Sequence, residues 1–123
     1  MFLNDPAIAQ LVVTSLRYHA IALKQYELYA FVLMGNHVHV LLKPMVPPPK
    51  LLQSLKRYTA RQANLLLGRT GRRFWQNESS DHWVRNGEEF DRIVAYIHNN
   101  PVRAGFVDSA EQYRWSSAFP TQW

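Results

Sequence analysis

The stretch from residue 26 to residue 44 constrains the fold of this chain most. Val38, Val40 and Leu42 alternate with His37, His39 and Leu41, and this period of two predicts a half-buried strand that ends at Pro44. The preceding run 26–34 is rich in strand formers, and Gly35-Asn36 between the two runs is a typical hairpin turn. An antiparallel pairing of the histidine strand with residues 28–34 is therefore predicted.

Two histidines occupy alternate positions of this strand. Positions i and i+2 of a strand face the same side, so the imidazoles of His37 and His39 should project together while Val38 and Val40 point into the core. Two neutral imidazoles can share one divalent cation if a third ligand comes from elsewhere. Taken alone, however, a histidine pair on a strand is more often structural than metal-binding.

Two helices are predicted on either side of the hairpin. Asn4 and Asp5 before Pro6 predict a helix start, and the helix that follows should run for about five turns. His19 lies near its apolar edge and is given no role. A second helix is predicted from about Lys50 to Leu67. Its buried stripe is expected to consist of Leu51, Leu52, Leu55, Tyr58, Leu65 and Leu66.

The last third of the chain predicts a short strand and another helix. The strand is expected at Trp83–Arg85, and the helix at residues 86–99, with an acidic first turn and with Pro101 as its stop. Tyr96 and Asn100 are four residues apart and share a flank if the helix persists that far. Without a partner motif, Tyr96 would be interpreted as a buried aromatic residue with a capped hydroxyl.

Length and composition indicate one domain covering residues 1–123. The chain has no cysteine, so disulfides and thiolate metal sites are excluded and any metal must bind nitrogen and oxygen. No apolar run reaches the length of a membrane span, and no signal peptide precedes the first helix, so a cytoplasmic protein is expected.

The second helix and the loop after it are basic. The net charge of the chain is +5, which mildly favours a polyanionic partner. Tyr58, Phe74 and Trp75 lie among the cations, and aromatic rings interleaved with cations favour binding of unpaired bases over an ordinary solvated face. The candidate nucleic-acid-binding residues are Lys56, Arg57, Arg61, Arg69, Arg72 and Arg73.

Three sequence motifs occur in order along the chain. Residues 36–42 read Asn-His-Val-His-Val-Leu-Leu, residues 74–76 read Phe-Trp-Gln, and residues 96–107 read Tyr-Ile-His-Asn-Asn-Pro-Val-Arg-Ala-Gly-Phe-Val. The combination resembles the REP-associated tyrosine transposases. These belong to the single-tyrosine HUH transposases, which are named after a histidine-hydrophobe-histidine motif. The first motif alone is unspecific, and the identification depends on its combination with the last one.

The resemblance implies an α+β, ferredoxin-like antiparallel sheet with helices packed on it and the HUH motif on a strand. It also implies cleavage and rejoining of single-stranded DNA at hairpin-forming repeats. By motif match, Tyr96 would be the nucleophile, and His37, His39 and Asn100 would bind Mg²⁺ or Mn²⁺. No nucleotide cofactor is expected, because the chain has no phosphate-binding loop of the Walker type. The partner would be single-stranded or hairpin DNA, and the protein a monomer or homodimer.

The sequence departs from the family at its beginning. Family members usually begin with a strand before the first helix, whereas only four residues precede Asp5 here. A missing first strand, and hence a domain shortened at its N-terminus, is therefore expected. Two alternative functions stay open: a catalytically inactive single-stranded nucleic-acid-binding domain, and a metal-dependent phosphoesterase that uses water as its nucleophile.

Overall fold

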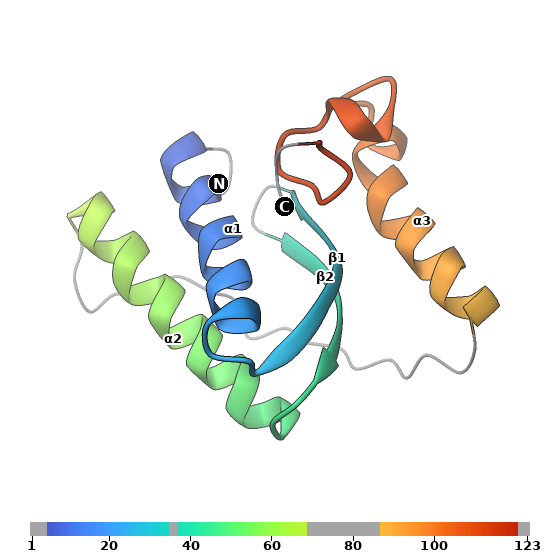
Figure 1. Ribbon diagram of the computed structural model, residues 1–123. Coiled ribbons are helices and arrows are strands. Elements are labelled where there is room, and N and C mark those ends of the chain that lie inside the picture. The colour runs from blue at the N-terminus through green and yellow to red at the C-terminus, as the bar shows by residue number, and fades with distance from the viewer. Residues whose placement is uncertain (1–4, 35–36, 69–86, 121–123) are drawn as a thin grey trace.

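A computed structural model of the chain describes residues 5–34, 37–68 and 87–120 (Figure 1). In chain order, its elements are helix α1 (Pro6–Ile21), strands β1 (Tyr26–Met34) and β2 (His37–Pro44), helices α2 (Pro48–Leu67) and α3 (Gly87–Arg103), and a short 3₁₀ helix η2 (Ala110–Gln112). The expected α+β class is confirmed. The Gly35-Asn36 turn and the strand expected at Trp83–Arg85 lie outside the described residues.

The predicted hairpin is present, and its register decides which residues share a face. β1 and β2 are antiparallel, with Val32 opposite His39 and Met34 opposite His37. A bulge lies between Leu28 and Ala30. An extra residue reverses the alternation of side chains along a strand, so Leu28 packs with α1 whereas Ala30 packs on the opposite face.

The sheet is covered on both faces (Figure 1). On one face, Phe31 and Leu33 of β1 pack with α1 and with Ala63 of α2. On the other face, Ala30 and Val32 pack with Ile97 of α3 and with Leu41 of β2. The described residues therefore form three layers, with α1 and α2 on one side of the hairpin and α3 on the other.

The segment before the C-terminus pairs with the free edge of β1. The amide of Leu33 donates to the carbonyl of Trp115 (2.9 Å), and the amide of Ser117 donates to the carbonyl of Phe31 (3.0 Å). Tyr113 adds a bond from its hydroxyl to the carbonyl of Leu33 (2.6 Å). β1 is thus held between β2 and this segment, which places β1 at the centre of the described sheet.

Two sequence-based predictions about the helices are wrong. The first concerns Pro101, which does not stop α3: the helix continues to Arg103 and ends where Gly105 has φ +79°. The amides of Gly105 and Phe106 donate to the carbonyls of Val102 and Pro101, which is the Schellman pattern. Pro101 costs the helix one backbone bond, and its side chain is fully buried, which offsets that loss.

The second wrong prediction concerns the buried stripe of α2. Tyr58, Leu65 and Leu66 were expected inside, but they are 40%, 56% and 61% exposed. The predicted burial of Leu51 is confirmed, and the helix also buries Thr59, Ala63 and Asn64. Leu51, Thr59 and Ala63 are separated by multiples of four residues and so lie along one face, and Ala63 packs in the cluster that contains the α1 residues. Local hydrophobicity could not indicate that a threonine and an alanine would face the core.

The stability of the fold should depend on pH in the alkaline range because of Tyr26. Its hydroxyl donates to the carbonyl of Leu16 (2.6 Å), and burial raises its pKa above the ordinary value of 10.0. The folded state therefore holds the hydroxyl proton of Tyr26 more tightly than the unfolded state does. The contribution of Tyr26 to stability is present below pH 10 and is lost as the pH rises above this value. Tyr26→Phe should lower the unfolding free energy by about 1 kcal/mol at neutral pH.

The same variant should also lose less stability than the parent between neutral and alkaline pH. Urea unfolding at a series of pH values up to about 11 measures both effects. Part of the alkaline loss should remain, since burial also raises the pKa of Tyr113. An alkaline loss as steep as that of the parent chain would show that Tyr26 does not hold its proton more tightly in the folded state.

Candidate active site

The histidine strand presents His39 to the layer that contains α3. His39 lies directly opposite Val32, and residues paired in this way share a face of the sheet. Val32 is fully buried in the cluster that includes Ile97 of α3. Val38 and Val40 pack on the other side, against the cluster of α1 and α2. The half-buried His39 therefore faces α3, whereas the side chain of His37 lies outside what the structure describes.

Helix α3 carries the other two residues of the predicted catalytic set. Its core face includes Ile97 and Pro101, both buried, and the helix contacts both strands. Tyr96 is 57% exposed, and Asn100, one turn later on the same flank, is half-buried. The interpretation of Tyr96 as a buried aromatic residue is therefore wrong.

One arginine contacts Tyr96 twice. The guanidinium of Arg103 lies 4.2 Å from the centroid of the Tyr96 ring. The Nη2 group of Arg103 also donates to the backbone carbonyl of Tyr96 (2.9 Å). The sequence analysis did not identify Arg103 as part of the site. The signal that could have found it is its spacing of seven residues from Tyr96, about two helical turns, which places both side chains along one line of the helix.

His98, which lies between Tyr96 and Asn100 on α3, has a different environment. Its Nε2 lies 2.7 Å from the Oγ of Ser117, which in turn accepts from the amide of Phe31 (2.9 Å) and donates to the carbonyl of Phe31 (3.2 Å). Burial lowers the pKa of His98, and the nearby Glu111 opposes this effect. His98 thus links α3 to the C-terminal segment and to β1. Sequence patterns gave no sign of this contact between residues far apart in the chain.

The described part of the basic surface lies on α2. Arg57 and Arg61 are exposed and Lys56 is half-buried. Because α2 covers the face of the sheet opposite α3 (Figure 1), these cations do not lie beside His39. The remaining candidates, Arg69, Arg72 and Arg73, fall outside the described residues, as do Phe74 and Trp75.

Exposed aromatic rings accompany these cations. Tyr58 stacks on Tyr18 of α1, with ring centroids 6.2 Å apart and planes inclined by 17°. The buried His19 meets both rings edge-on and is held by a 2.8 Å contact between its Nδ1 and the carbonyl of Ser15. Glu27 is the only carboxylate between residues 6 and 67, so the two-helix layer presents tyrosine rings within a basic environment.

Comparison with known proteins identifies the family. A family model described as "Transposase IS200 like" matches residues 8–100. This chain belongs to the IS200-like transposases. The match covers the histidine strand and extends along α3 to Asn100, and membership indicates a DNA-processing enzyme of transposition. Neither the curated proteins nor the solved structures contain a match to the chain.

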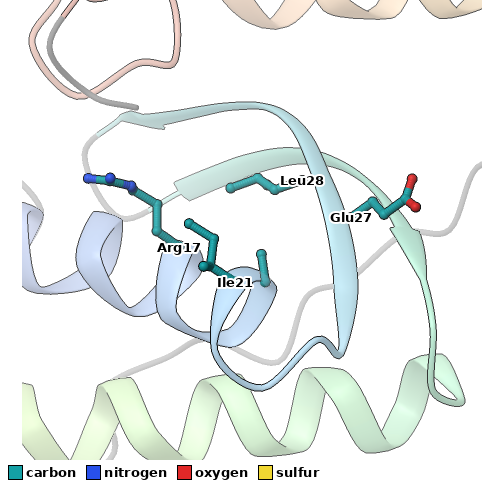
Figure 2. Close-up of a pocket in the computed structure, with 5 residues that line it drawn as sticks. Arg17, Ile21, Glu27 and Leu28 are labelled. Carbon is teal, nitrogen blue, oxygen red and sulfur yellow. The ribbon is translucent and has the colours of Figure 1, made fainter.

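One hollow described in this transposase lies away from His39. It has a volume of about 310 Å³ and is lined by residues from the end of α1 and the start of β1: Arg17, Ala20, Ile21, Glu27 and Leu28. Figure 2 shows the guanidinium of Arg17 and the carboxylate of Glu27 at opposite ends of this hollow, with Ile21 and Leu28 between them. Two charged groups that diverge in this way do not converge on a common ligand.

None of the helices within the described residues is long and apolar enough to cross a membrane.

Proposed function

We propose that this IS200-like transposase is a REP-associated tyrosine transposase, which cuts and rejoins single-stranded DNA at hairpin-forming repeats. The observation that carries the proposal is the exposed phenol of Tyr96 on the helix that covers the His39 face of the sheet. Ile97, the next residue along the helix, is buried against the sheet, whereas the side chain of Tyr96 is mostly exposed. The expectation that the substrate is a hairpin-forming repeat comes from the motif resemblance.

In the proposed reaction, the Oη of Tyr96 attacks the phosphorus of a phosphodiester. The new bond joins Oη to phosphorus, the bond from phosphorus to the 3′ oxygen breaks, and the proton of the phenol is transferred to solvent while the 3′ oxygen gains one. The products are a 5′-phosphotyrosine and a free 3′-hydroxyl. Attack by that hydroxyl reverses the step, so no nucleotide cofactor is needed to rejoin the strand.

The residues of the site fit a hard divalent cation. Within the described residues, the His, Asp and Glu side chains do not form a group of three that could hold a metal ion. The amide oxygen of the half-buried Asn100, on the helix that faces His39, is a further donor that could complete a ligand set. His37, His39 and Asn100 would together offer nitrogen and oxygen, a set compatible with Mg²⁺ or Mn²⁺.

A bound cation of this kind supplies Lewis acidity toward a non-bridging phosphate oxygen. The need for it follows from the nucleophile, since a phenol is a weak nucleophile at neutral pH. The contribution of the chain is to hold the phenol of Tyr96 and the donor groups of His39 and Asn100 on two elements that pack together.

A denaturing gel of the protein with a labelled single-stranded hairpin oligonucleotide, in Mg²⁺ or Mn²⁺, tests the proposal. We expect part of the label to migrate with the protein after boiling in detergent. Cleaved oligonucleotide without any covalent adduct would favour the metal-dependent phosphoesterase. Binding without cleavage or adduct would favour an inactive single-stranded nucleic-acid-binding domain.

The basic residues of α2 and of the loop after it are proposed to bind the DNA backbone. The exposed Arg57 and Arg61 are testable members of this set. Phosphate contacts release counterions, and each contact with a single strand contributes about 0.7 to the slope of log affinity against log salt. The double variant Arg57→Gln/Arg61→Gln should therefore flatten that slope by about 1.4, for specific and unrelated oligonucleotides alike.

The control for this prediction is Gln53→Ala, a neutral change at an exposed position of the same helix. It should leave the slope as it is. If the double variant also kept the slope of the parent, with its fold intact by circular dichroism, Arg57 and Arg61 would be ordinary solvated cations. The DNA would then have to lie elsewhere, and the α3 side of the sheet would be the next surface to test.

A further inference from the structure

The Arg103 side chain runs back along α3 to Tyr96. Seven residues correspond to nearly two turns, so the two positions differ by about 20° around the helix axis. Helical side chains lean toward the N-terminus, which brings the guanidinium over the ring at 4.2 Å and its Nη2 within 2.9 Å of the Tyr96 carbonyl. The backbone bond holds the guanidinium in place, and the ring contact holds the phenol.

An exposed tyrosine needs such a restraint if it is to act as a nucleophile. With 57% of its surface exposed, Tyr96 lacks the tight packing that fixes side chains in a core, so its χ1 angle would sample several staggered rotamers. Attack on phosphorus requires the oxygen close to the reacting atom and in line with the bond that breaks. A cation resting on one face of the ring favours the rotamer that keeps this contact.

The hydrogen bond from Arg103 to the Tyr96 carbonyl also stabilises the helix close to Pro101. Pro101 has no amide hydrogen, so the carbonyl of Ile97 loses its usual helical partner. Arg103 binds the carbonyl of the preceding residue, Tyr96. The backbone and the ring of Tyr96 are therefore held by one side chain, just where the helix is least constrained by its own hydrogen bonds.

We propose that Arg103 is a positioning residue for Tyr96, holding the phenol in one orientation on the surface of α3 before DNA arrives. This inference rests on the proposed nucleophilic role of Tyr96. It assigns Arg103 to the orientation of the nucleophile and predicts that the affinity for DNA does not depend on it.

The first test compares the rate of adduct formation with the affinity for DNA. In Arg103→Gln, the single-turnover rate at saturating oligonucleotide should fall about tenfold or more, because misplacement of a reacting group by about 1 Å costs up to a hundredfold. The dissociation constant should stay within about twofold, since orientation of the nucleophile acts on the chemical step. Arg103→Lys, which keeps a cation but loses the planar fork, should have an intermediate rate.

A matched control is available in the C-terminal segment. Arg114 lies over the ring of Trp115 at 4.6 Å, so Arg114→Gln also removes an exposed arginine from an aromatic face. It should leave the rate of adduct formation unchanged. An equal fall in both variants would mean that loss of positive charge, rather than positioning, slows the reaction, and the proposal would be overturned.

The second test needs neither DNA nor activity. In the NMR spectrum of the free protein, the side-chain CH₂ protons of Arg103 should be shifted upfield by the ring current of Tyr96, and Tyr96→Leu should abolish that shift. An Arg103 spectrum without this shift would overturn the proposal, as would an unchanged rate or a matching loss of DNA affinity in Arg103→Gln. If the parent protein formed no adduct, the proposed function would fail, and the NMR result alone would decide whether Arg103 orients the ring.

Discussion

Tyr96→Phe is expected to abolish the covalent protein–DNA adduct while leaving the affinity for a hairpin oligonucleotide within about twofold of the parent value. The variant removes only the oxygen that would attack phosphorus. Its ring remains available for the contact with Arg103, which lies over the ring face. The side chain is mostly exposed, so the change should also leave the stability of the fold nearly as it was.

Tyr58→Phe is the matched control, because Tyr58 is also an exposed tyrosine. It belongs to α2, which packs on the face of the sheet opposite α3, and its adduct should form at the parent rate. Adduct formation that survived in Tyr96→Phe and vanished in Tyr58→Phe would reverse the assignment. In that case, the layer built from α1 and α2 would contain the reactive residue.

The second large effect is expected from the proposed metal ligands. His39→Ala should reduce cleavage by more than about a hundredfold, since even the loss of an outer partner of a metal ligand costs ten- to a hundredfold. Asn100→Ala should have its largest effect at limiting Mn²⁺ and should recover partly as Mn²⁺ is raised. Titration of cleavage against Mn²⁺ concentration measures both effects.

His98→Ala is the comparison that makes this experiment decisive. In the structure, His98 contacts the hydroxyl of Ser117, so its loss should lower the unfolding free energy by about 1–3 kcal/mol. It should leave the Mn²⁺ concentration for half-maximal cleavage unchanged. A greater loss of cleavage at limiting Mn²⁺ in His98→Ala than in Asn100→Ala would mean that the ligand assignment on α3 is wrong.

The sequence was sufficient for the hairpin because a strand has a short and rigid repeat. Alternation around His39, with a turn signal just before the strand, fixed both the pairing partner and the face that each valine occupies. The side-chain pattern of the neighbouring strand β1 was harder to predict from the sequence. Its bulge places Leu28 and Ala30 on opposite faces, and nothing in the order of the residues 26–34 marks the position at which the alternation reverses.

The buried faces of the helices were harder to predict from the sequence, because tertiary contacts determine them. In α2, the leucines at 65 and 66 are exposed whereas Thr59 and Ala63 are buried, and Ala63 packs in the cluster that contains the α1 residues. Within the candidate site, the helical period was enough to predict that Tyr96 and Asn100 lie on the same flank of a helix. The contact of His98 with Ser117 was not, because residues far apart in the chain met only through the fold.

Mass-spectrometric mapping of the trapped adduct tests whether Tyr96 is the nucleophile. After reaction with a hairpin oligonucleotide in Mn²⁺, protease and nuclease digestion should leave a peptide that contains Tyr96 and has gained a 5′-phosphorylated nucleotide. The modification should sit on the Tyr96 oxygen, and the other oligonucleotide fragment should end in a free 3′-hydroxyl. A nucleotide on any other residue, or complete cleavage with every peptide unmodified, would contradict the assignment of Tyr96 as the nucleophile.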